Sequence, residues 1–135
     1  MIHNQIYLKE SENEKDSVQI TDLLFLSPGM KIILGIAHMS AEYLGKRLIL
    51  SSLINDREDA NPLTDTHARG DGIDIRIWGW SLAKKRYFVS LVNELVPEKL
   101  KPAGKQAAVL EEDHIHLQCR AGAKIFALTP TKSAF

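Results

Sequence analysis

The sequence predicts a single α+β domain, on three observations. Two segments have helical features, Pro28 to about Leu44 and Ser81 to about Val96. Three or four short apolar runs beside them suit strands. Helices and strands do not alternate strictly along the chain, which favours an α+β domain over a parallel α/β fold. The length of 135 residues fits one domain that spans residues 1–135.

Each predicted helix has recognisable ends. Ser27 offers an oxygen to cap the first helix, and Pro28 is tolerated at the first helical position because its missing N–H has no partner there. Gly45 is a plausible stop for this helix. Ser81 caps the second helix and Pro97 ends it.

The predicted strands are short, and one of them alternates strictly between apolar and polar residues. That strand is Gly72 to Trp78, the clearest in the chain. The others are Arg47 to Ile54, Gln106 to Leu110 and His114 to Cys119, the last two forming a hairpin through residues 111–113. Residues 55–66 form a long loop, of a length that is often functional, and residues 99–104 form a linker.

Composition excludes several function classes. Lys plus Arg and Asp plus Glu both number 17, so no net field attracts nucleic acid or an anionic membrane. The single cysteine, Cys119, permits no intrachain disulfide, which is compatible with a reducing cytosol. Residues 1–15 lack the apolar region of a signal peptide, and the stretch 30–44 is too short and too charged to span a bilayer. We expect a soluble cytoplasmic chain with neither nucleic acid nor membrane as partner.

Strand alternation gathers metal-binding side chains on one face. In the strand 72–78, Asp74 and Arg76 share the face opposite the isoleucines, and His114 and His116 share a face of the last strand. If both strands belong to one sheet, the aspartate and the histidines converge. His67 lies in the loop that precedes the first of these strands.

These donors match the requirements of catalytic zinc, which takes three protein ligands and keeps one position for water. His67, Asp74 and His116 supply that set. Asp113 is the natural base to accept the proton of the water, with Glu112 as its competitor. His114 could hydrogen-bond an oxyanion or orient the base. Arg57 could neutralise the oxyanion or bind a substrate carboxylate.

Residues 67–74, His-Ala-Arg-Gly-Asp-Gly-Ile-Asp, resemble the HxxGxAxD motif of the D-Ala-D-Ala metallopeptidases. That family shares its fold with the Hedgehog signalling domain and with phage L-alanyl-D-glutamate endolysins. Residues 113–116, Asp-His-Ile-His, are similar to its second motif, and residues 50–57 to the strand-and-arginine segment upstream. The resemblance covers about residues 28–119 and follows the family's order of elements.

The resemblance implies a small, mostly antiparallel sheet with helices packed on one face. It implies a zinc peptidase, either a D,D-carboxypeptidase or an L-alanyl-D-glutamate endopeptidase, acting on bacterial cell-wall peptides. The family's zinc ligands fall on His67, Asp74 and His116, its catalytic acid on Asp113 and, more loosely, its arginine on Arg57. Two positions depart from the motif, Asp65 in place of Ser and Gly72 in place of Ala.

Other interpretations of these residues remain open. A His-x-His pair on a strand is commonly a solvated sheet face, and Arg76 could be the partner that a mid-strand Asp74 needs. The alternative function is a non-catalytic, metal-stabilised binding or virion structural module of the same fold. For the peptidase, a phage-type enzyme released at lysis and a cytosolic dipeptidase both fit. Cys119 is interpreted as a core residue and not as a nucleophile. For Trp78 and Trp80, a role in the core is preferred over a role as a platform for substrate.

Overall fold

The structure is a computed structural model that describes residues 6–8, 20–52 and 70–122. These residues form five strands: β1 (Ile6–Leu8), β2 (Leu48–Ser52), β3 (Gly72–Arg76), β4 (Ala108–Leu110) and β5 (His114–Gln118). Two α-helices accompany them, α1 (Pro28–Tyr43) and α2 (Leu82–Leu95), with the 3-10 helices η2 (Ile20–Phe25) and η3 (Glu98–Leu100).

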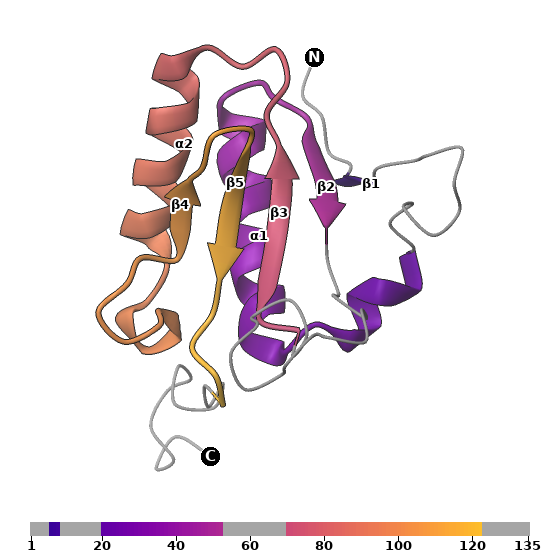
Figure 1. Ribbon diagram of the computed structural model, residues 1–135, viewed down its shortest axis with the longest axis vertical. Helices are drawn as coiled ribbons and strands as arrows, with labels where there is room; N and C mark the ends of the chain where they lie inside the picture. Colours follow the sequence, from indigo (N-terminus) through magenta and orange to yellow (C-terminus); the bar gives the residue numbers. More distant parts are fainter. Residues whose placement is uncertain (1–5, 9–19, 53–69, 123–135) are drawn as a thin grey trace.

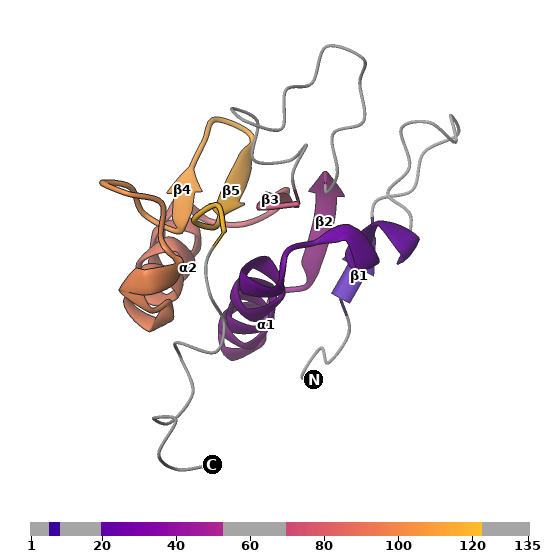
Figure 2. The ribbon, with the colours of Figure 1, turned by 90° about the horizontal axis from the view of Figure 1, so that it is seen from below.

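The strands make one mixed sheet in the order β1-β2-β3-β5-β4 (Figure 1). β1 runs parallel to β2, and the other three pairs are antiparallel. Both α-helices lie on the same side of the sheet, as Figure 2 shows. The predicted α+β class is therefore confirmed. Within the described ranges, no helix has the length and apolar character needed to cross a bilayer.

Both helices begin at the predicted serines. The Ser27 hydroxyl accepts a hydrogen bond from the Met30 amide at 3.1 Å, and the Ser81 hydroxyl accepts one from the Lys84 amide at 3.2 Å. Such caps stabilise a helix by about 1 kcal/mol each because they satisfy amides that have no partner within the helix. Gly45 follows α1 with φ +71°, the left-handed conformation expected where a helix stops.

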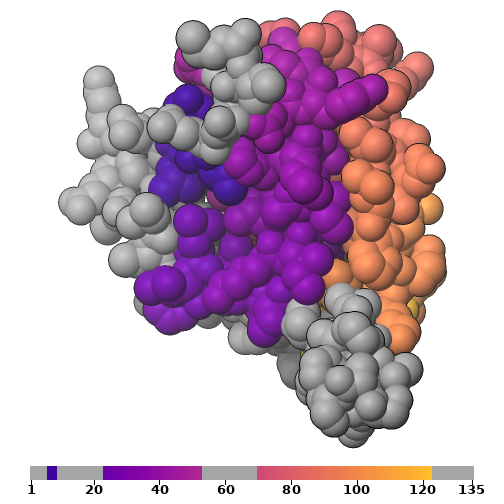
Figure 3. Space-filling view, turned by 180° about the vertical axis from the view of Figure 1, so that it is seen from behind, coloured from indigo at the N-terminus to yellow at the C-terminus, as the bar shows by residue number. Residues whose placement is uncertain are grey.

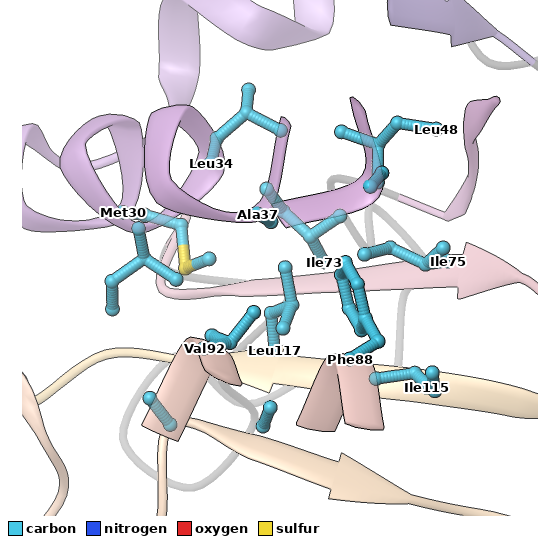
Figure 4. Packing of buried hydrophobic residues seen from close by; sticks show 14 of the residues in the cluster. Met30, Leu34, Ala37, Leu48, Ile73, Ile75, Phe88, Val92, Ile115 and Leu117 are labelled. Carbon is cyan, nitrogen blue, oxygen red and sulfur yellow. The ribbon is translucent and has the colours of Figure 1, made fainter. Parts of the chain in front are cut away.

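The core lies between the sheet and the two helices. Ile73 and Ile75 of β3 are fully buried, as are Ile115 and Leu117 of β5. Figure 4 shows these strand residues packing against side chains from both helices, among them Met30, Leu34, Ala37, Phe88 and Val92. Viewed from the helix side, α1 and α2 lie next to each other over the sheet (Figure 3). One strand face is thus used for packing, which leaves the other face of β3 and β5 for polar residues.

Three elements were not predicted. β1 has only three residues and depends on parallel pairing with β2, a tertiary contact that its own sequence does not signal. η2 precedes α1, and η3 occupies the start of the segment predicted to be a linker. The strand predicted at 72–78 is shorter in the structure, at 72–76. The strand predicted at 47–54 corresponds to β2 at 48–52, and residues 53 and 54 lie outside the described residues. The predicted loop 55–66 lies outside the described residues.

The chain enters β3 through a closely packed glycine. Gly70 has φ +78°, and its carbonyl accepts a hydrogen bond from the Ser27 amide at 2.9 Å. A Cβ on Gly70 would lie 2.3 Å from the carbonyl oxygen of Phe25. The next carbonyl, that of Asp71, accepts a bond from the Cys119 amide at 2.9 Å. This short segment joins the start of α1, the start of β3 and the end of β5.

Asn93 joins α2 to the edge strand β4. Its Nδ2 donates to the Ala108 carbonyl at 2.9 Å, and its Oδ1 accepts from the Ala108 amide at 2.7 Å. Asn93→Ala would leave both backbone groups of a buried residue without these partners. We expect it to lower the free energy of unfolding by about 2 kcal/mol, as measured in urea. Glu94→Ala, at the exposed neighbouring position, is the control, and an equal loss in both variants would contradict the role given to Asn93.

Candidate functional site

Asp74 and His116 face each other across the central pair of strands. β3 and β5 are antiparallel, and Asp74 lies directly opposite His116 in their register. A hydrogen bond of 2.9 Å joins Asp74 Oδ1 to His116 Nδ1. Both side chains are largely covered, with 21% of the aspartate and 17% of the histidine exposed. Alternation from the buried isoleucines of β3 places this pair on the sheet face opposite the helices.

His114 extends this pair into a row of four groups. Its Nε2 lies 3.5 Å from Asp74 Oδ1, and its Nδ1 lies 2.7 Å from Asp113 Oδ1. Asp74 therefore lies between two imidazoles, and His114 lies between two carboxylates. The predicted convergence of Asp74, His114 and His116 is confirmed.

Asp113 forms the solvent-facing end of the row, with 84% of its side chain exposed. The hydrogen bond from His114 is the main reason that the pKa of this carboxyl is lowered from its usual value. The contact with His114 therefore favours the deprotonated form of Asp113. That is the state in which a carboxylate can accept a proton.

A cavity of about 260 Å³ lies beside the row, and we call it the acidic cavity. Asp74, Asp113 and His114 line it, together with Ser51, Ser52, Arg76 and Trp78. The Ser51 hydroxyl donates to the Asp74 carbonyl at 3.3 Å, which ties the end of β2 to β3 at this place. Of the two candidate bases, Asp113 is the one that lines the cavity.

Two of the predicted site residues, His67 and Arg57, lie outside the described residues. Within ranges 6–8, 20–52 and 70–122, no group of three or more His, Cys, Asp or Glu side chains is arranged to hold a metal ion. The described part of the predicted ligand set is thus the pair Asp74 and His116. Its third member belongs to the segment that is not described.

The spacing of this pair can be compared with what zinc requires. Zinc binds imidazole nitrogen and carboxylate oxygen at about 2.0–2.2 Å, so two ligands at a tetrahedral angle have donor atoms about 3.3 Å apart. The observed separation of Asp74 Oδ1 and His116 Nδ1 is 2.9 Å. A small movement of either side chain would make room for a shared ion. The two residues therefore fit a zinc site in both donor type and spacing.

Arg76 and Trp78 line the acidic cavity but were not predicted to belong to the site. The guanidinium carbon of Arg76 lies 3.9 Å from the centre of the Trp78 ring, a cation–π contact. Trp78 is 72% exposed, so the preference for a core role is wrong for this residue, whereas Trp80 is buried. Trp78 lies two residues after Arg76, and alternation places it on the face turned away from the helices. The signal was present in the sequence, because Trp78 continues the alternation of Asp74 and Arg76.

Comparisons with protein-family models, with curated proteins and with solved structures gave no match to this chain.

Proposed function

We propose that the chain is a zinc peptidase that hydrolyses short peptides of the bacterial cell wall containing D-amino acids. His67, Asp74 and His116 would hold the metal, and Asp113 would serve as the general base. The fold would be that of the Hedgehog and D-Ala-D-Ala peptidase family. In support, the order of α1, β2, β3, α2 and the β4–β5 hairpin agrees with the order of elements that the sequence resemblance implies.

The observation that carries the proposal is the Asp74–His116 pair. Its members are 42 residues apart in the chain, yet they lie opposite each other with donor atoms 2.9 Å apart. Aspartate is disfavoured in strand interiors, so a mid-strand aspartate that faces a histidine is unusual without a role. Both residues fall on the positions where the resemblance implies zinc ligands.

Asp113, His114 and Arg57 would each have a separate role in catalysis. Zinc bound by this set would lower the pKa of a bound water and polarise a scissile carbonyl. Asp113, deprotonated and beside the acidic cavity, can accept the water's proton and pass it to the leaving amine. His114 fixes the direction of the Asp113 carboxylate through their 2.7 Å contact. In this proposal Arg57 neutralises the oxyanion.

Metal analysis of the purified protein tests the ligand assignment. We expect about one zinc per chain, loss of most of it in His67→Ala and in His116→Ala, and a lower melting temperature after chelation, because a ligand that binds only the folded state stabilises it. His38→Gln is the control, since this histidine lies on α1 and belongs to neither motif. Protein that takes up no zinc, or that keeps it fully in His116→Ala, would contradict the assignment.

Mass spectrometry of peptidoglycan digests tests the reaction itself. A zinc-loaded protein that releases cell-wall peptide fragments, and stops doing so after chelation, supports the peptidase. Zinc binding without any cleavage would instead favour the non-catalytic, metal-stabilised module.

A further inference from the structure

A second cavity adjoins the acidic cavity, and its charge is opposite. It has a volume of about 330 Å³, and we call it the basic cavity. Its charged lining consists of Lys46, Arg47 and Arg76, and its walls include Ile49, Trp78 and Trp80. Arg76 and Trp78 line both cavities. The start of β2, the end of β3 and the turn that follows it meet at this end of the sheet (Figure 1).

None of the three cations has an acidic partner among the described residues. No carboxylate of that part of the chain lies within ion-pair distance of Lys46, Arg47 or Arg76. Lys46 Nζ donates to the Gly79 carbonyl at 3.4 Å, which positions it without neutralising it. The guanidinium groups instead lie over aromatic rings, that of Arg47 over Tyr7 at 5.2 Å and that of Arg76 over Trp78 at 3.9 Å.

A cation–π contact helps to hold a guanidinium in place without pairing it with a carboxylate. The fork of N–H donors of such a guanidinium matches the two oxygens of a carboxylate. Three positive charges around one cavity, none of them ion-paired with a described carboxylate, also create a local field that attracts a negative group. The exposed Trp78 ring offers an apolar surface beside that group. The basic cavity thus has the features of a site for an anion carried on a larger molecule.

Resting on the proposed function, we propose that the peptide substrate carries a free carboxylate away from the scissile bond, and that the basic cavity binds it. Arg76 follows Asp74 by two residues on the same strand face, which places it about 6.6 Å further along β3. A peptide in extended conformation covers this distance in two residues. The carboxylate recognised would therefore lie about two residues from the bond beside Asp74 and His116.

Two peptides that differ by one charge test this inference. Both have the sequence L-Ala-D-Glu-L-Lys-D-Ala-D-Ala with an amidated C-terminus, so that the first carries a free carboxylate on its glutamate alone, and in the second this carboxyl is also converted to an amide. Binding to the full chain is followed by tryptophan fluorescence after zinc has been removed by chelation, so that the peptides stay intact, and Trp78 reports on it because it is exposed in both cavities. Hydrolysis is measured separately, by mass spectrometry of a cell-wall digest with zinc present. We expect the acidic peptide to bind about five- to tenfold more tightly, with a preference that declines as salt is raised.

Charge-removing variants locate the binding site. Arg76→Gln and Arg47→Gln should each reduce the preference for the acidic peptide several-fold. Arg47 is exposed, so its replacement leaves the core unchanged. Lys31→Gln is the matched control, because it removes the same charge from an exposed position near the other end of α1 and should keep the full preference. A parallel titration with inorganic phosphate distinguishes a site that is specific for a peptide carboxylate from a site that binds any anion.

Equal binding of the two peptides would overturn the inference. So would a preference that survives in both arginine variants, or phosphate binding as tight as that of the acidic peptide. The proposed function fails in a different way. A preference for the acidic peptide without any hydrolysis would support the anion site in the basic cavity and refute the peptidase. Hydrolysis with equal binding of both peptides would support the peptidase and refute the anion site.

Discussion

Replacing Asp113 with Asn is expected to lower kcat about 10²–10⁴-fold while zinc stays bound, because this change removes the general base and no metal ligand. The amide oxygen of Asn can still accept the hydrogen bond that joins residue 113 to His114 Nδ1 at 2.7 Å. The geometry of the row is therefore kept and only the proton acceptor is lost. The measurement is the hydrolysis rate of a cell-wall peptide, with zinc content determined on the same sample.

Glu112→Gln is the matched control for this experiment. Glu112 is also exposed and lies one residue earlier in the same turn, so it tests a carboxylate at nearly the same place. We expect this variant to retain near-parental activity. Activity that survives in Asp113→Asn but disappears in Glu112→Gln would transfer the role of base to Glu112. Activity that survives in both variants would show that the catalytic centre does not lie in this row of residues.

Gly70→Ala is expected to destabilise the fold by about 3 kcal/mol or more, measured by urea unfolding. Two effects add up in this estimate. A left-handed backbone conformation disfavours any residue with a Cβ by about 1–2 kcal/mol. In addition, the new Cβ would lie 2.3 Å from the Phe25 carbonyl oxygen, so the backbone before α1 has to move. That movement would disturb the hydrogen bond from the Ser27 amide to the Gly70 carbonyl.

Gly45→Ala separates the two effects. Gly45 has nearly the same conformation, with φ +71°, but a Cβ built on it meets nothing within 4 Å. This variant should therefore lose only the conformational part, about 1–2 kcal/mol. If the free energy of unfolding falls by the same amount in both alanine variants, the close approach of Gly70 to the segment before α1 does not contribute to stability.

The sequence predicted those parts of the fold that local chemistry determines. Ser27 and Pro28 identify the start of α1 because capping and proline geometry act within one turn. Strict alternation in β3 identified which side chains share a face with Asp74. β1 could not be found in this way, since three residues carry too little pattern and their strand conformation depends on pairing with β2.

The same division holds for the candidate site. Residue type and alternation were sufficient to single out Asp74, His114 and His116. The register that places Asp74 opposite His116 depends on the packing of two strands far apart in sequence, so it required the structure. Alternation already placed Arg76 and Trp78 on the same face as Asp74. The two cavities depend on how side chains from separate strands are arranged in space, so the contribution of these residues to the cavities was missed.

The order of strands also bears on how fast the molecule folds. β4 and β5 are joined by a short turn, so their hairpin needs little loop closure, and η3 alone lies between α2 and β4 in the order of elements. The pairing of β3 with β5 is different, because Asp74 and His116 are separated by 42 residues. Contacts of such sequence separation form only after the entropy of closing a long loop has been overcome. The aspartate–histidine pair thus carries a larger entropic cost of loop closure than the hairpin does, and a metal ion bound between the two residues would offset part of that cost.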